Sequence, residues 1–510
     1  MSLELRGLGA RVAGLRAGWH GDLLALLCGV LTVLAFAPFN AWPLIVFTLA
    51  ALFWLLGGSY PRRAFWRGLL FGIGEFGFGL YWLYISIHVV SGAPVWATFL
   101  VIIGLVLAMA FYSALTCALA AWLLPRAGVW RSALLLPGLW VVLEWLRGWV
   151  LSGFPWLSLG YSQIDSVLRG YAPLVGVYGV SLAVALSAGL VLSAALSRHV
   201  WARGTCLAVL AGIWMAAALL AGRSWTTPAG APVQFSLIQG DIPQSLKWDP
   251  QEYLVTLERY QRLTSEHWAS RVIIWPEAAI PAYADEVRKD YLDPLAAEAR
   301  AHHTDMLIGI LTENLSNGDA YNSVISLGAQ AGVYDKRHLV PMAEYFPAPA
   351  WVTHWLEAHN LPYASFTPGA PRQPPLRVAG YPVATSICYE DAFGAEIMRD
   401  LPQARYLVNV TNDAWFGESI ALPQHFEISR MRAVEAGRYL LRTTNTGITA
   451  VVNTHGAIVQ RLPEDVVGVL TAQVPPYAGS TPYVRWGNRV VVVIGLLLIL
   501  AGALGRLGRK

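Results

Sequence analysis

Seven long apolar runs before residue 225, and an eighth near the end of the chain, constrain this sequence more than any other feature. A transmembrane helix needs about 20 mostly apolar residues. The runs lie near residues 22–38, 42–58, 68–90, 94–124, 132–151, 171–197, 204–222 and 490–504. Because 55% of the 510 residues are hydrophobic and only 13% are charged, an ordinary soluble protein is excluded. We predict a multi-span α-helical membrane domain with about eight transmembrane helices.

Charge divides the chain into three parts. The net charge is +8 over residues 1–230, −9 over residues 231–475 and +5 over residues 476–510. A nucleic-acid-binding domain presents a basic face, so the acidic middle argues against nucleic acid as a partner. We predict an N-terminal transmembrane domain of seven helices at 1–225, a soluble domain at 226–478 and a C-terminal transmembrane helix at 479–510.

Arginines between the apolar runs predict the orientation. Short cytoplasmic loops carry an excess of Lys and Arg, and clustered arginines fall on every second connection, within residues 6–16, 62–67, 126–131 and 198–203. The opposite connections, 38–42 and 91–94, carry no charge. This alternation places both termini in the cytoplasm and the acidic domain on the other face of the membrane.

Three ionisable residues, Glu75, Glu144 and Arg147, lie inside apolar runs, where a charge is costly and often marks function. Glu144 and Arg147 are three residues apart on one predicted helix and can pair. We favour a structural ion pair, with a proton or ion pathway as the alternative. A transporter or receptor would bring polar residues from several spans together, and the sequence has few beyond these three.

Residues 226–478 change to short β-branched runs separated by polar residues, Gly and Pro. The expected strands are 233–239, 271–275, 306–310, 321–327, 382–387, 405–410 and 442–453, and the expected helices are 250–269, 290–301 and 423–437. Strands that alternate with helices predict an α/β layered domain. A two-sheet core flanked by helices suits this count.

Three strand ends carry chemistry, the second of them in the further segment Val333–His338, and open α/β sheets place their sites at strand ends. One delivers the carboxylate of Glu277, another the amine of Lys336, and a third the thiol of Cys388. Each also has an ordinary explanation: a helix N-terminal acid, a solvated lysine or a core cysteine. The other cysteines, Cys28, Cys117 and Cys206, lie in apolar runs and are expected to pack there.

Together and in this order, the three residues resemble the Glu–Lys–Cys triad of the nitrilase superfamily, whose fold is an α-β-β-α sandwich. With membrane spans on both sides, the chain resembles the apolipoprotein N-acyltransferase family. The similarity covers nearly the whole chain. The segments that carry the similarity are Gln239–Gln244, Trp248, Trp275–Glu277, Tyr334 to Lys336 with Glu344, Cys388–Glu390 and Asn412–Phe416.

The resemblance implies an enzyme of the bacterial inner membrane with its catalytic domain on the periplasmic side. It implies transfer of an acyl chain from a phospholipid, usually phosphatidylethanolamine, through a cysteine thioester to the N-terminal amine of the diacylglyceryl-cysteine of an apolipoprotein. The implied residues are the catalytic Glu277, Lys336 and Cys388, the supporting Glu344, Tyr389 and Glu390, and the substrate-binding Trp248, Trp415, Asn412 and Phe346.

The chemistry of these side chains agrees with that mechanism. A thiol is only a few per cent ionised at neutral pH and needs a base, and no histidine flanks Cys388. Glu277 can serve if burial raises its pKa, and Lys336 with the backbone N–H of Tyr389 or a neighbour can hold the oxyanion. An amine attacks a thioester far more readily than an oxygen ester, so an amide can form without ATP.

Some questions stay open from sequence. The main alternative is a membrane-anchored carbon-nitrogen hydrolase of the amidase or nitrilase type, in which water takes the acyl group. The aromatic stretch Tyr345–Phe366 suits a membrane-interface arm or lid, or ordinary core, and the 152–171 connection is a weaker candidate for facing the acyl site. Metal-binding motifs, a P-loop and a dinucleotide fingerprint are absent, so we predict no metal and no cofactor.

Overall fold

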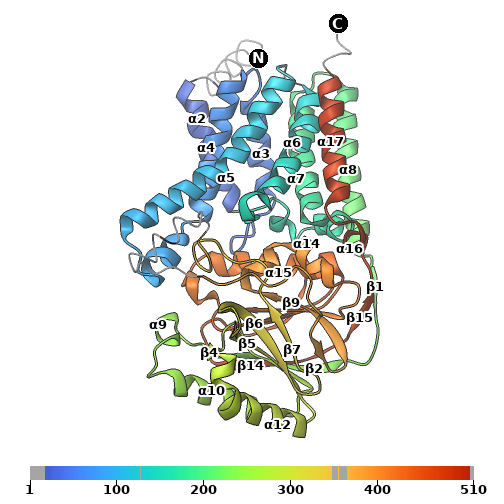
Figure 1. Ribbon diagram of the computed structural model, residues 1–510. Coiled ribbons are helices and arrows are strands. Elements are labelled where there is room, and N and C mark those ends of the chain that lie inside the picture. Colours follow the sequence, from blue (N-terminus) through green and yellow to red (C-terminus); the bar gives the residue numbers. More distant parts are fainter. Residues whose placement is uncertain (1–15, 17, 127, 347–353, 355–364, 506–510) are drawn as a thin grey trace. The chain divides into compact units, whose positions relative to one another are not determined.

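The computed structural model describes residues 16, 18–126, 128–346, 354 and 365–505 (Figure 1). The chain divides into two compact units. The first consists of Met1–Arg223, Ser419–Glu427 and Trp486–Lys510, and the second of Ser224–Glu418 and Ile428–Arg485. Most of the predicted aromatic arm, at 347–353 and 355–364, lies outside the described residues.

Each of the eight predicted apolar runs overlaps a helix of the first unit. These are α2 (Gly18–Val33), α3 (Leu44–Leu55), α4 (Pro61–Gly79), α5 (Val95–Leu123), α6 (Leu136–Arg147), α7 (Ala172–Leu196), α8 (Val200–Ala221) and α17 (Arg489–Leu504). Within the described residues, three helical segments are long and apolar enough to cross a membrane: Val95–Leu123, Val167–Leu196 and Val200–Ala221. The helices α2, α3 and α17 are apolar but shorter.

Small residues allow close helix packing in this unit, as is usual between membrane helices. A Cβ on Gly138 of α6 would lie 2.7 Å from the carbonyl oxygen of Gly495 on α17. A Cβ on Gly72 of α4 would lie 2.5 Å from the Cα of Ala110 on α5. These glycines are needed because the helix backbones leave no room for a side chain.

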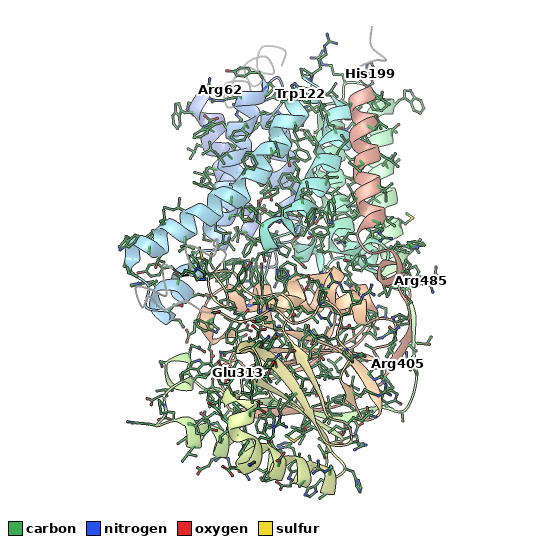
Figure 2. All side chains as sticks on the ribbon, in the orientation of Figure 1. Arg62, Trp122, His199, Glu313, Arg405 and Arg485 are labelled. Atoms are coloured by element: carbon green, nitrogen blue, oxygen red, sulfur yellow. The ribbon has the colours of Figure 1, made fainter. Side chains whose placement is uncertain are left out.

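Figure 2 shows Arg62, Trp122 and His199 at the same end of the first unit. Arg62 lies at the start of α4, Trp122 near the end of α5, and His199 just before α8. Three of the connections that the arginine pattern assigned to one side therefore lie at one end of the helical unit.

The short hydrogen bonds of Glu144 and Arg147 go to the segment that follows α6. Their direct ion pair is long, at 3.9 Å between Arg147 Nη2 and Glu144 Oε1. Arg147 Nη1 donates to the carbonyl oxygens of Phe154 (2.8 Å) and Trp156 (2.7 Å), and Glu144 Oε1 accepts from the backbone N–H of Leu159 at 2.7 Å. These bonds support the structural interpretation of the pair. Trp156, in the 152–171 connection, is itself buried in the first unit, where its Nε1 donates to Gln424 Oε1 at 2.7 Å.

Two large sheets form the second unit. The seven-stranded sheet has the order β14 (Gly468–Val474), β2 (Val233–Gln239), β3 (Val272–Ile274), β5 (Asp305–Asn314), β6 (Asp319–Leu327) and β7 (Gly332–Asp335), with β4 (Ile280–Tyr283) also paired to β5. The six-stranded sheet has the order β13 (Ile458–Arg461), β12 (Ala450–Val452), β11 (Leu440–Thr444), β10 (Tyr406–Thr411), β9 (Tyr381–Ile387) and β8 (Arg377–Val378). The central strands β2, β3 and β5 are parallel, as are β9, β10 and β11. A small sheet pairs β1 (Thr226–Pro228) with β15 (Tyr477–Gly479).

Alternating side chains build the layers, because neighbouring residues of a strand face opposite sides of its sheet. Ile274 and Leu441 belong to the core between the two sheets. Ile273 instead packs in the outer core with α10 (Tyr253–Ser265) and α12 (Asp293–Ala301) (Figure 1). Arg442, next to Leu441, bonds to Ser429 of α15 (Ala421–Ala436) on the other outer face. The order of layers is therefore α-β-β-α, as predicted.

Candidate active site

Strand ends of both sheets deliver the three predicted catalytic side chains. Glu277 follows β3, Lys336 follows β7 and Cys388 follows β9. Cys388 has a φ of 51°, and Ala278, just after Glu277, has a φ of 43°. Such left-handed backbone is uncommon for residues with a side chain and clusters at active sites. The backbone therefore turns sharply after β3 and again after β9, where each strand leaves its sheet.

Glu277 is held from three sides. Its Oε1 accepts a hydrogen bond from Asn322 Nδ2 at 2.8 Å and lies 3.6 Å from Lys336 Nζ. Its Oε2 accepts from the backbone N–H of Asn412 at 2.9 Å. The side chain is 10% exposed. This carboxylate is buried, oriented and bonded through both oxygens.

Lys336 lies between two carboxylates. Its Nζ donates to Glu344 Oε1 at 2.8 Å, besides its contact with Glu277. Burial lowers the pKa of Lys336, but the charges of Glu344, Glu277 and Cys388 and the hydrogen bond to Glu344 outweigh it, so the pKa lies above its usual range. The amine is therefore a permanent cation, as an oxyanion-binding group needs to be.

Cys388 rests as a thiol. Burial raises its pKa well above the ordinary value, and the charges of Glu277 and Asp413 raise it further, against a lowering by Lys336 and a hydrogen bond with Thr411. The electrostatic interactions with Glu277 and Lys336 place all three groups in one site. Because the resting thiolate is disfavoured, the nucleophile needs a base during the reaction.

The Glu390 carboxylate joins the backbone just before Cys388 to the backbone just after Lys336. Its Oε2 accepts from the backbone N–H of Ile387 at 2.7 Å, and its Oε1 from those of Arg337 (2.6 Å) and His338 (3.1 Å). The Tyr334 hydroxyl donates to both oxygens. Burial raises the pKa of Glu390 to about 7 although the three backbone N–H groups lower it. A supporting role for Glu390 in the reaction stays a prediction.

The other predicted residues have varied surroundings. Tyr389 follows the nucleophile, and its ring lies 5.1 Å from the Phe393 ring. The Asn412 side chain bonds to protein groups, donating to Gln244 Oε1 at 2.7 Å and accepting from Asn445 Nδ2 at 2.9 Å. Trp248 is 49% exposed, whereas Trp415 and Phe346 are half-buried. Substrate binding by these residues stays a prediction.

Sequence reasoning did not single out three residues of this site. Asn322 Nδ2 donates to Glu277 and also to Glu344 Oε1 at 3.0 Å. Lys247 Nζ donates to the main-chain oxygen of Glu277 at 3.0 Å. Arg442, fully buried, bonds to Asp391 (3.2 Å) and Asp413 (2.9 Å), which lie after Cys388 and after β10. The only available signal was the position of Lys247 beside Trp248.

Replacing Asn322 by Ala is expected to slow acylation of Cys388 by about 10- to 100-fold, the usual effect of losing hydrogen bonds to charged groups. Two carboxylates that share one amide would lose their common donor, and Glu277 would no longer be aligned with Lys336. The rate of acyl-enzyme formation in a single turnover, followed by intact mass spectrometry, measures this loss. Asn317→Ala, at an exposed turn, is the matched control. An unchanged rate for Asn322→Ala would show that Lys336 and the Asn412 N–H align Glu277 without Asn322.

No group of three or more His, Cys, Asp or Glu side chains within the described ranges is arranged to hold a metal ion. The chemistry available to the site is that of a buried thiol, two carboxylates and a lysine cation. This set can accept a proton from the thiol, stabilise an oxyanion and form a covalent acyl intermediate.

Known proteins match both units. The model of the apolipoprotein N-acyltransferase N-terminal domain matches residues 28–190, and that of the carbon-nitrogen hydrolases matches residues 235–483. Among solved structures, a carbon-nitrogen hydrolase from Helicobacter pylori G27 is 15% identical, with a TM-score of 0.37, and the match covers 48% of this chain and 89% of that one.

Relatives match over almost the full length. An apolipoprotein N-acyltransferase from Methylococcus capsulatus is 45% identical over 472 residues, which cover 91% of this chain and 92% of the relative. One from Nitrosomonas europaea is 41% identical over 494 residues, covering 96% and 98%. Identity at this level and coverage leaves one assignment: the chain belongs to the apolipoprotein N-acyltransferase family.

Proposed function

We propose that this protein transfers a fatty acyl chain from a phospholipid, through a thioester on Cys388, to the free α-amine of the diacylglyceryl-cysteine that begins an apolipoprotein. The observation that carries the proposal is the buried thiol beside Glu277 and Lys336. These residues lie within a carbon-nitrogen hydrolase domain that follows an apolipoprotein N-acyltransferase N-terminal domain.

In the first half-reaction Glu277 takes the thiol proton while the Cys388 sulfur attacks the ester carbonyl carbon. The resulting oxyanion is stabilised by the Lys336 ammonium and by a backbone N–H such as that of Tyr389. Collapse of the tetrahedral intermediate breaks the ester C–O bond. The leaving lysophospholipid oxygen takes the proton from Glu277, and a thioester remains on Cys388.

In the second half-reaction the acceptor amine attacks the thioester carbonyl and gives a proton to Glu277. Breaking the C–S bond forms the amide and releases the Cys388 thiolate, which recovers that proton. The same base and the same cation therefore serve both steps. The products are a triacylated lipoprotein and a lysophospholipid.

We further propose phosphatidylethanolamine as the usual donor, in a bacterial inner membrane crossed by eight helices. The domains are then 1–225, 226–478 and 479–510, with the catalytic domain on the periplasmic side and both termini in the cytoplasm. The helix found in each predicted run and the alternating arginines support this arrangement.

A two-stage assay tests the proposed function. Purified protein incubated with dipalmitoyl phosphatidylethanolamine is expected to gain the mass of one palmitoyl chain, which hydroxylamine removes. A diacylglyceryl-cysteine peptide added next should gain that chain as an amide, while the enzyme returns to its original mass. Matched peptide with an acetylated α-amine is the control and should stay unchanged. Release of free fatty acid at the same rate with and without acceptor peptide would favour the hydrolase alternative.

A further inference from the structure

A second buried lysine distinguishes this site. The chain contains only four lysines, and two of them, Lys247 (4% exposed) and Lys336 (1% exposed), are buried in the second unit. Lys247 forms part of the short helix α9 (Gln244–Lys247). Its charge interacts with both Glu277 and Cys388, so it belongs to the neighbourhood of the reaction.

The two lysines differ in how their charges are balanced. Lys336 has two carboxylates, at 2.8 and 3.6 Å. Lys247 Nζ donates to one main-chain oxygen, that of Glu277, and no carboxylate of the described residues lies within 4.0 Å of it. Burial lowers the pKa of Lys247 to about 8, against a raising by the charges of Glu277 and Cys388. A buried ammonium with no carboxylate beside it favours an incoming anion.

A cavity lies at this lysine. Its volume is about 250 Å³, and it is lined by Lys247, Trp248, Asp249, Pro250, Tyr253 and Pro281. A water molecule occupies about 30 Å³ in the liquid, so the cavity has room for roughly eight waters. A phosphoethanolamine group has about that number of non-hydrogen atoms, whereas a long acyl chain is much larger. The size suits a lipid headgroup.

We propose that this cavity binds the headgroup of the phospholipid donor, with Lys247 as the cation that contacts its phosphate. The proposal rests on the proposed function and assigns a residue to donor recognition. The phosphate and the ester carbonyls of a phospholipid share one glycerol, so a carbonyl at Cys388 carries its phosphate only a few atoms away. At the other end of the headgroup, Asp249 and the aromatic rings of Trp248 and Tyr253 suit an ammonium group.

The test compares two acyl donors, one with a phosphate and one without. Acyl-enzyme formation is followed by intact mass spectrometry with dipalmitoyl phosphatidylethanolamine and with p-nitrophenyl palmitate. Lys247→Gln is expected to lower the ratio of the two second-order rate constants, phospholipid over phosphate-free ester, by about 10- to 100-fold. Lys247→Arg, which keeps the charge, should recover part of the loss. Lys289→Gln, at an exposed lysine, is the matched control.

Several outcomes would overturn the proposal. An equal loss with both donors would show that Lys247 acts through the Glu277 peptide instead of on a phosphate, and no loss with either would show that it has no role. Soluble glycerophosphoethanolamine should slow the wild-type reaction with phospholipid; competition by inorganic phosphate of equal strength would exclude recognition of a headgroup. Failure of the proposed function looks different, since wild-type protein would then form no acyl-enzyme with phospholipid.

Discussion

Cys388→Ala is expected to abolish both the thioester and the transfer of the acyl chain, a loss of at least about 10⁴-fold in rate. Removing a nucleophile from a covalent mechanism typically costs about this much or more. The thiol is the only group of the site that can carry the acyl chain between donor and acceptor. Alanine, like cysteine, bears a Cβ, so the left-handed backbone at this position (φ 51°) is no harder to form. The variant should therefore fold and insert normally.

Intact mass spectrometry after incubation with phospholipid measures the result. Wild-type protein should gain one hydroxylamine-sensitive acyl chain, and Cys388→Ala should gain none. Cys206→Ala makes the same change at a buried cysteine of α8 and should behave as wild type. A Cys388→Ala protein that still acylates the acceptor peptide would remove Cys388 as the nucleophile.

Glu277→Gln has the second large expected effect, a loss of about 10²- to 10⁴-fold in formation of the acyl-enzyme, the usual contribution of a general base. The Cys388 thiol is protonated at rest because burial raises its pKa, so without a base little thiolate forms. Glutamine also places an NH₂ group either where the carboxylate accepts from Asn322 beside Lys336 or where it accepts from the Asn412 N–H. The new NH₂ group would then face one of those N–H donors, with no acceptor for either.

The time course of acylation at several phospholipid concentrations separates this loss from weaker lipid binding. Glu266→Gln, at an exposed position after α10, is the matched control. If Glu277→Gln protein accumulated acyl-enzyme at the wild-type rate but failed to pass the chain to the peptide, Glu277 would act only in the second half-reaction.

The layered fold could be predicted because the central strands are buried on both faces and therefore appear as short β-branched runs. The strand β14 was missed: its exposed and buried residues alternate, unlike those of the central strands. It pairs with β2 along its whole length although the two are more than 220 residues apart in sequence. No local pattern encodes such a pairing, because it depends on burial that only the assembled sheet provides.

The residues of the candidate site also divide into those that the sequence could predict and those that it could not. Glu277, Lys336 and Cys388 could be recognised because each follows a strand-like segment and the three, in this order, resemble a known triad. The groups that align them could not: Asn322 lies within β6 with no motif around it, and the donor from Asn412 is a main-chain N–H that any residue would supply. Lys247 lies in a short polar segment, and only the folded structure shows that its side chain is buried.

Glu390 has a further consequence for a catalyst that handles two lipid substrates in turn. Its carboxylate joins the strand end before the thiol to the strand end of the ammonium, through three backbone N–H groups and one hydroxyl. The spacing of nucleophile and cation is therefore set by bonds that neither substrate makes or breaks. The Cys388 thiol and the Lys336 ammonium do not have to be repositioned after the lysophospholipid leaves and before the acceptor amine binds. We therefore expect one spacing of the Cys388 thiol and the Lys336 ammonium to serve both half-reactions.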